Sequence, residues 1–324
     1  MPSVIKPDVY LIFGNGWISS QIREILEAQG KTVIVSKTRT ENREQVLTEL
    51  NELNDRGVVH VFNCAGLRGT PNADWCEDHS IEVTRSNILG ALNVADCCYL
   101  LGIHLTYFGS GCIYDQDADH PLDGTGFTEE EPPFYGGSMY SRSRLYAENV
   151  DNPYFSYPSS HMMYIADSRR LGMSIQVMRV YPNVLILRLR GPMAADLHPK
   201  NLLTRLMKYE RLINIPSSVS VLSNLLPGAV LMASHGVTGV FNLVNPGPCT
   251  NNDIMERARE HIRPGLAWEN FAVADMNRVL RAPRANVTLD AGKLVRQCRE
   301  LGYEIKTSHE ALDDMFLEMK KKGL

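Results

Sequence analysis

The sequence predicts a doubly wound parallel α/β sheet followed by a smaller, mostly helical lobe, and three observations support this fold class. Short apolar runs alternate with helical periodicity through the first half of the 324-residue chain. A turn that contains glycine joins the first apolar run to the first helical segment. Beyond Pro192 apolar runs become sparse and helical patterns dominate. We therefore place a first domain at residues 1–191 and a second lobe, interleaved with it, at residues 192–324.

The predicted strands are apolar runs that are too short to form helices and are bounded by turn residues. They are Val9–Phe13, Thr32–Val35, Val58–Phe62, His104–Phe108, Val184–Leu189 and, in the second lobe, Val240–Val244. Helical segments separate them, so we expect the strands to run parallel, with helices on both faces of the sheet.

The predicted helices show apolar residues at helical spacing. They are Trp17–Gln29, Glu44–Leu53, Val83–Leu101, a helix that carries Tyr140, Leu202–Tyr209, Leu222–Ser234, Asp253–His261, Ala291–Leu301 and Ser308–Lys320. The stretch from Gly109 to Gly137 is rich in Gly, Pro, Asp and Glu, which indicates a loop over a cleft.

The composition excludes several classes of protein. The chain has 33 basic and 37 acidic residues, a net charge of −4, so general nucleic-acid binding is not expected. No apolar run approaches the roughly 18 residues that span a bilayer, and the N-terminal segment has no signal-peptide pattern. Seven cysteines without a CxxC pair favour free thiols. We expect a cytoplasmic protein with no membrane partner and no metal site.

The segment Gly14-Asn15-Gly16-Trp17-Ile18 lies between the first predicted strand and the first helix. A dinucleotide fold needs small residues there, because the backbone turns tightly and approaches the pyrophosphate at the helix N-terminus. A turn with only a structural role is the alternative. Asn63, Ala65 and Gly66 follow the third strand and predict a second turn against the cofactor. The sequence thus indicates an NAD(P)-binding Rossmann fold.

The residues after the second strand favour NADPH over NAD. An NAD site usually places an acid there for the ribose hydroxyls. This chain has Lys37 and Arg39 instead, and both can bind a 2′-phosphate. Ordinary surface cations are the alternative.

Ser110 follows the fourth predicted strand, and Tyr140 begins a helix farther along the chain. A serine that orients a carbonyl and a tyrosine that donates a proton form the acid–base pair of a carbonyl reductase. Arg144 lies one helical turn after Tyr140, where a cation lowers the pKa of the tyrosine and holds the ribose.

With these residues the chain resembles the extended short-chain dehydrogenases/reductases. Within that group it is similar to the 3,5-epimerase/4-reductases of nucleotide-rhamnose synthesis, and more distantly to the dTDP-4-dehydrorhamnose reductases. The matching stretches are Gly16–Ile18, Pro71–Glu77, Ser110–Ile113, Asn214–Ser217, Asn245–Gly247, Ala282–Asn286 and Leu289-Asp290.

The resemblance implies a bifunctional enzyme that epimerises C3 and C5 of UDP-4-keto-6-deoxyglucose and then reduces C4 with NADPH to give UDP-L-rhamnose. Cys112 matches the family's epimerisation cysteine, and Arg205 stands where the family has a lysine. The family positions Asn72, Asn214, Asn245 and Arg284 are expected to contact the nucleotide sugar. An upstream 4,6-dehydratase is expected to supply the substrate. The base of the nucleotide and a homodimeric state are left open.

Several residues depart from the family pattern. Arg144 and Arg205 replace lysines, and arginine cannot relay a proton as lysine does. His198 is a candidate substitute for the lost epimerisation lysine, and Ser19 replaces the last glycine of the phosphate loop. An alternative is therefore a non-catalytic NADP-binding subunit, similar to the regulatory subunit of methionine adenosyltransferase.

The 27-residue segment Val150–Gln176 is an insertion relative to the family. Without it, the helix of Tyr140 would run directly into Val177. A valine codon begins with GT and a glutamine codon can end in AG, so we interpret the segment as a retained intron. A genuine surface insertion is the alternative.

Overall fold

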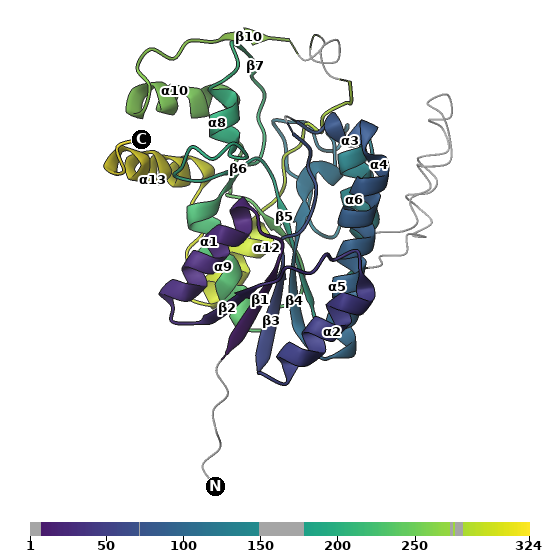
Figure 1. Cartoon of the computed structure of the whole chain (residues 1–324). Helices are drawn as coiled ribbons and strands as arrows, with labels where there is room; N and C mark the ends of the chain where they lie inside the picture. The colour runs from purple at the N-terminus through teal and green to yellow at the C-terminus, as the bar shows by residue number, and fades with distance from the viewer. Residues whose placement is uncertain (1–7, 71, 149–177, 273–274, 276–280) are drawn as a thin grey trace, which may run out of the picture.

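The computed structural model describes residues 8–70, 72–148, 178–272, 275 and 281–324. Its centre is a six-stranded sheet with the order β2-β1-β3-β4-β5-β9, in which all neighbouring strands run parallel (Figure 1). The strands are β1 (Val9–Phe13), β2 (Thr32–Val35), β3 (Val58–Asn63), β4 (His104–Ser110), β5 (Val184–Leu189) and β9 (Gly239–Leu243). The predicted fold class is confirmed.

The strand order reverses at β1, and this reversal fixes where a ligand can bind. The chain leaves β1 toward β2 on one side and returns to β3 on the other. Loops that leave the carboxyl ends of β1 and β3 therefore diverge and open a crevice, which is where parallel α/β sheets bind ligands.

Helices cover both faces of the sheet (Figure 1). One face packs against α1 (Trp17–Ala28), α9 (Leu222–Ser234) and α12 (Gly292–Glu300), and the other against α2 (Arg43–Asn54), α5 (Gly90–Leu100) and α6 (Met139–Glu148). The inner strands β1, β4 and β5 are buried on both faces almost throughout, which is why their sequences are largely apolar, whereas the edge strand β2 is only partly buried.

The helical lobe has a core of its own. It contains α8 (Leu202–Leu206), α10 (Asn251–His261), α13 (Ser308–Lys321) and two short parallel strand pairs, β6 (Pro192–Met193) with β8 (Ser220–Val221) and β7 (Arg211–Ile213) with β10 (Glu269–Phe271). Because β9, α9 and α12 pack with the sheet, the predicted boundary at residues 191/192 is crossed by chain that returns to the first domain.

The predicted helix Val83–Leu101 is not one regular helix. It is divided into α4 (Ser80–Val83), a π-helical stretch η1 (Thr84–Leu89) and α5. The π-helical stretch contains Asn87, whose amide bonds the backbone of Leu67 and the Ser143 hydroxyl. The irregularity thus ties the loop after β3 to α6.

Both ends of α6 are anchored. At its start Glu77, in α3 (Trp75–Asp78), accepts a hydrogen bond from the Met139 amide at 2.6 Å and forms an ion pair with Arg142. At its end Glu148 forms a fully buried ion pair with Arg188 of β5, 2.6 Å between Oε2 and Nη2. The predicted insertion 150–176 lies outside the described residues. Among the described residues, no helix is both long and apolar enough to span a membrane.

Candidate active site

The two loops at the crevice contact each other through Gly14. Gly14 has φ of +92°, and a Cβ there would lie 2.7 Å from the Ala65 amide nitrogen. Only glycine tolerates both the backbone conformation and the close approach. At the start of α1 the Ser19 hydroxyl bonds the Gly16 amide at 2.7 Å. Ser19 therefore closes the first turn of the helix, and the loop keeps the compact form that a pyrophosphate requires.

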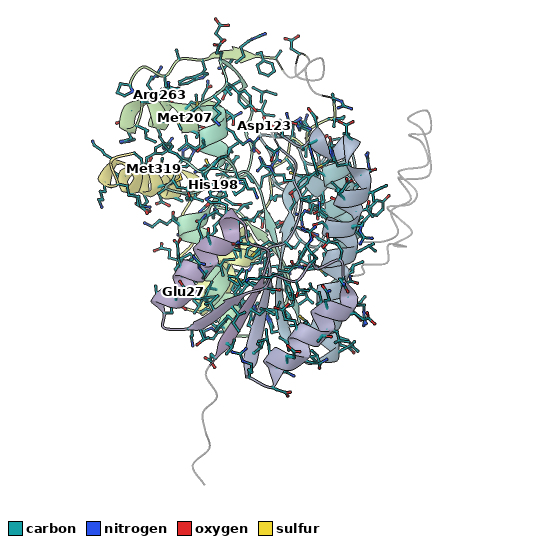
Figure 2. The ribbon with its side chains drawn as sticks, viewed as in Figure 1. Glu27, Asp123, His198, Met207, Arg263 and Met319 are labelled. Carbon is teal, nitrogen blue, oxygen red and sulfur yellow. The ribbon has the colours of Figure 1, made fainter. Side chains whose placement is uncertain are left out.

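A loop from the helical lobe lies over this turn. The Trp17 indole donates to Asp196 at 2.7 Å, and the His198 ring stacks on Trp17 with 5.4 Å between centroids. In Figure 2 His198 lies between α1 and the helical lobe. The Lys200 ammonium is 3.7 Å from the position of a Cβ on Gly16. The structure thus puts His198 beside the predicted cofactor loop, where it stacks on Trp17, and gives no support to its role as an epimerisation acid.

Lys37 and Arg39 are exposed at the carboxyl end of β2, as a 2′-phosphate site would need. Arg39 forms an ion pair with Glu41 at 2.7 Å, so its guanidinium already has one anionic partner. Ser36, between the strand and these cations, is buried and donates to Glu49 at 2.7 Å.

Tyr140 and Arg144 lie together on α6, as predicted. The Arg144 guanidinium is 5.5 Å from the centre of the Tyr140 ring and donates to the Tyr107 hydroxyl at 3.0 Å. Burial alone would lower the pKa of Arg144, but the Tyr107 and Tyr140 hydroxyls raise it by more. The guanidinium also lies so close to Gly66 that a Cβ there would collide with it. Arg144 therefore joins the loop after β3 to the helix of the candidate acid.

Cys112 lies at the end of β4 and is bonded to an arginine from the next strand. Arg190 follows β5 and donates through Nη1 to Cys112 Sγ at 3.0 Å. The Ser110 hydroxyl accepts from the Cys112 amide at 3.2 Å. Burial raises the pKa of the Cys112 thiol, but Arg190, Ser110 and Arg68 lower it by more, so the net shift is downward. Cys112 lies on η2 (Gly111–Ile113), and α6 packs against this short helix.

A group of arginines surrounds Arg205 on α8. Burial lowers the pKa of Arg205 to about 10, and the positive charges of Arg68 and Arg284 contribute to the shift. Arg284 donates to Asn72 at 3.3 Å and to Asp74 at 2.8 Å. The structure thus brings together Asn72, Arg205 and Arg284 and adds Arg68, which also lowers the pKa of Cys112.

Two predicted substrate contacts lie elsewhere. Asn245 is buried, and its amide bonds the Val221 amide, the Asn224 side chain and the Lys306 carbonyl. Its hydrogen-bonding groups are therefore used within the fold, and we no longer expect it to contact a substrate. Asn214 is exposed, and its oxygen accepts from the Asn252 amide in the first turn of α10.

Buried polar atoms without a protein partner gather at the crevice. Among the described residues they include Asn63 Nδ2, the Tyr135 hydroxyl and the Nε atoms of Arg144, Arg190 and Arg205. A buried donor without a partner is costly, on the order of 1–3 kcal/mol. Such donors at one edge of the sheet are the arrangement that a bound polar ligand satisfies.

Sequence reasoning missed Arg68, Tyr107, Tyr135, Arg190 and Lys200. Tyr107 and Arg190 lie on or beside predicted strands, and the pairing of Ser110 with Leu189 in the register of β4 and β5 places Arg190 next to Cys112. That register is the signal that could have found Arg190, but it requires the strand order. Lys200 and Arg68 come from loops, whose positions no sequence pattern gives.

Comparisons with known proteins identify the family. Residues 10–155 match the family described as NAD dependent epimerase/dehydratase family. The chain is 36% identical over 295 residues to a bifunctional dTDP-4-dehydrorhamnose 3,5-epimerase/reductase of Arabidopsis thaliana, covering 90% of this chain and 88% of the relative. It is 35% identical to a trifunctional dehydratase/epimerase/reductase of that plant, covering 91% of this chain but only 40% of the relative.

A solved structure gives the same result. The crystal structure of the UDP-rhamnose synthase of Acanthamoeba polyphaga mimivirus matches with a TM-score of 0.81 and 28% identity, covering 96% of this chain and 99% of that chain. The resemblance inferred from the motifs is confirmed. The chain therefore belongs to the NAD(P)-dependent epimerase/dehydratase family, in its group of nucleotide-rhamnose 3,5-epimerase/reductases.

Proposed function

We propose that the protein epimerises C3 and C5 of UDP-4-keto-6-deoxyglucose and then reduces C4 with NADPH, giving UDP-L-rhamnose. One observation carries the proposal. The bonded pair of Cys112 and Arg190 lies on the same edge of the sheet as Tyr140 and Arg144, with α6 packed against η2. A thiol suited to proton exchange and a tyrosine suited to carbonyl reduction are the two chemical functions that the reaction needs.

The arginines support a nucleotide sugar as substrate. The positive charges of Arg68 and Arg284 lie close enough to Arg205 to lower its pKa. The Nε–H of Arg205 is buried and has no partner among the described residues. Arginine binds phosphate oxygens through paired N–H donors. We assign the substrate diphosphate to Arg68 and Arg284, with Asn72 positioning Arg284 through its hydrogen bond.

In the epimerisation, Cys112 exchanges protons at the carbons next to the C4 ketone. A carbonyl at C4 acidifies these protons because the resulting negative charge moves onto oxygen. Arg205 stands near this negative charge, and its lowered pKa brings it nearer to the range in which a group exchanges protons. A guanidinium is a weaker acid than the ammonium of lysine, so we assign to Arg205 chiefly the electrostatic stabilisation of the enolate.

In the reduction, Tyr140 donates a proton to the C4 oxygen, and Ser110 orients that oxygen. Bound NADPH supplies the hydride. Arg144 keeps its positive charge, orients the Tyr140 ring beside it and holds the ribose hydroxyls. Arginine carries out both of these roles without needing to change its protonation state.

We infer NADPH rather than NADH from Lys37 and Arg39, which are exposed after β2. The fit of a dinucleotide is supported by the turn at Gly14, by the unpartnered Asn63 amide and by Lys200 beside Gly16. A 4,6-dehydratase must supply the substrate, because the reaction starts from a 4-keto-6-deoxy sugar. The seven free cysteines favour a cytoplasmic location.

The test is NADPH oxidation, followed by absorbance, with UDP-4-keto-6-deoxyglucose as substrate. The full chain, a version without residues 150–176 and the variant Tyr140→Phe are compared. We expect turnover by the full chain and a loss of about 10²–10⁴-fold in Tyr140→Phe. Turnover only without residues 150–176 would support the enzyme and would make that segment inhibitory or an artefact of translation from an intron.

NADPH binding without turnover by either chain would contradict the proposal. It would favour the alternative of a non-catalytic NADP-binding subunit, which the arginines at positions 144 and 205 also allow. A parallel reaction with the dTDP-linked sugar decides the base of the nucleotide.

A further inference from the structure

Arg190 contacts Cys112 because of the sheet register. Ser110 of β4 lies opposite Leu189 of β5, so the residues that follow in the two parallel strands leave the sheet side by side. The Arg190 guanidinium donates to Cys112 Sγ at 3.0 Å and to the Ala285 carbonyl at 2.5 Å. Its backbone amide donates to Ser220 at 3.0 Å. The hydrogen bonds to Ala285 and Ser220 therefore hold Arg190 in the position from which its guanidinium contacts the sulfur.

None of the hydrogen bonds of Arg190 among the described residues goes to a carboxylate. Its Nε–H is buried and has no partner there. A half-buried guanidinium without an anionic partner stabilises negative charge on whatever atom it faces. The atom that it faces is the sulfur of Cys112.

We propose that Arg190 is a positioning residue that keeps Cys112, to which the proton exchange is assigned above, as a thiolate. This inference rests on the proposed function, because the proposed function identifies C3 and C5 of the sugar as the carbons that give their protons to Cys112. The thiolate itself is a property of the protein without substrate.

The proton transfer balances without an oxidant or a reductant. The Cys112 sulfur forms an S–H bond with a proton of C3 or C5, and the electron pair of the broken C–H bond moves into the enolate of the C4 carbonyl. The enolate carbon then takes a proton on its opposite face. Exchange with water supplies that proton and removes the one on sulfur, so the enzyme returns to its first state.

Cys112 differs from the other cysteines of the chain. Burial raises the pKa of the six others, which are Cys64, Cys76, Cys97, Cys98, Cys249 and Cys298. The pKa of Cys112 is lowered. At neutral pH a reagent that attacks thiolates should therefore select Cys112.

Other titratable groups lie near Cys112 and Arg190, and they change the stability of a thiolate at Cys112 in opposite directions. Arg68 favours the thiolate together with Arg190. Burial raises the pKa of Tyr135, and the charges of Asp115 and Cys112 add to the shift; its hydroxyl is buried without a partner among the described residues. Asp115 accepts from the Asn286 amide, and Arg190 lowers its pKa against the larger effect of burial. The test must therefore separate the charge of Arg190 from its hydrogen bond.

The experiment measures the rate of alkylation of Cys112 by iodoacetamide between pH 5 and 10 on the full-length protein, with the modified peptide quantified by mass spectrometry. Arg190→Gln keeps a donor but removes the charge, and Arg190→Lys keeps the charge. Arg281→Met is the matched control, because Arg281 is exposed and pairs with Asp78. The wild-type midpoint is expected below about 8.5, the value of an unperturbed thiol.

In Arg190→Gln we expect the midpoint to rise by about one pH unit, so that alkylation at pH 7 slows about tenfold. Arg190→Lys and Arg281→Met should remain near the wild type. An unchanged midpoint in Arg190→Gln would overturn the proposal. So would a wild-type midpoint at or above about 8.5, even if the glutamine variant failed to fold.

Alkylation needs neither substrate nor cofactor, so its outcome is independent of whether the protein turns over the sugar. A second readout uses the substrate. In Arg190→Gln, solvent deuterium should enter C3 and C5 about tenfold more slowly at pH 7 and recover toward pH 9, a shift of the pH profile that a structural role would not produce.

Discussion

Two arginines of the same strand segment, Arg188 and Arg190, have opposite surroundings. Arg188 is fully buried and donates to Glu148 at 2.6 Å and to the Tyr114 hydroxyl at 2.8 Å. Arg190, two residues later, is half-buried and donates to a thiol and a carbonyl. The first arginine has a full counter-charge within the protein, and the second has none among its hydrogen-bond partners in the described residues.

The difference shows how one strand serves both the fold and the chemistry. The pair of Arg188 and Glu148 holds the end of α6 on β5, below the edge of the sheet. Arg190 lies beyond the last paired residue of β5, where the sheet opens into the crevice. A buried charge that is neutralised by a hydrogen-bonded partner fixes structure, whereas a charge without a hydrogen-bonded carboxylate is available to act on a neighbouring group.

The largest effect is expected at Cys112, the partner of Arg190. Cys112→Ala removes the sulfur, so we expect deuterium exchange at C3 and C5 to fall by about 10²–10⁴-fold. The free energy of unfolding should change by less than about 1 kcal/mol, as measured by urea denaturation. A variant that loses stability but keeps the exchange would contradict this division of roles.

On the side of Arg188, Glu148→Gln leaves a buried guanidinium without its anion. The expected loss is about 3–5 kcal/mol in the free energy of unfolding, measured in the same urea series. The control Glu148→Met/Arg188→Met removes both charges and should recover most of that loss. If the single variant is as stable as the wild type, Glu148 does not anchor α6.

A smaller effect is expected at the cofactor end. Arg39→Ala removes an exposed cation, and we expect the KM for NADPH to rise about tenfold while that for NADH stays within about twofold. Steady-state kinetics with each cofactor give the two values. An equal change for both cofactors would mean that Arg39 does not distinguish them.

The smallest effect is expected at a buried histidine pair, which is neutral where the buried pair of Arg188 and Glu148 is ionised. His60 and His104 bond each other through their Nδ1 atoms at 2.9 Å, and burial lowers both pKa values. The unfolded chain, with histidine pKa values of about 6.5, binds more protons below that pH. Stability is therefore fully present above pH 6.5 and is lost as the pH falls below it.

Urea midpoints at pH 5.5 and 7.5 measure this dependence. His60→Gln should reduce the loss at pH 5.5, whereas His235→Gln, at an exposed position, should leave it unchanged. An equal pH dependence in the wild type and His60→Gln would show that the pair binds protons as readily in the fold as in the unfolded chain, and would contradict this prediction.

The sequence predicted the sheet well, because buried parallel strands leave apolar runs and α1 begins directly after a glycine turn. It also placed Ser110, Cys112, Tyr140 and Arg144 near the elements on which they lie, because motif and element together fix their positions; their roles stay predictions. It did not predict that Arg190 meets Cys112, which requires the pairing of β4 with β5. Nor did it predict that Asn245 forms hydrogen bonds with backbone groups of Val221 and Lys306. An asparagine in a motif gives the same sequence signal whether its side chain binds a ligand or the protein backbone.

The division of the long predicted helix illustrates the same limit. Periodicity continues through Thr84–Leu89, yet the backbone is π-helical there and carries Asn87 to the loop after β3. Tertiary hydrogen bonds of this kind override a local pattern. The arginines at positions 144 and 205 looked like losses of function in the sequence, but in the structure both lie at the crevice with unpartnered donors.

The most direct test of the account is the exchange of solvent deuterium into UDP-4-keto-6-deoxyglucose by the full chain without NADPH, followed by mass spectrometry. The account predicts deuterium at C3 and C5 before any reduction, and formation of the deuterated rhamnose nucleotide once NADPH is added. Absence of deuterium at both carbons, with NADPH still bound by the protein, would contradict it.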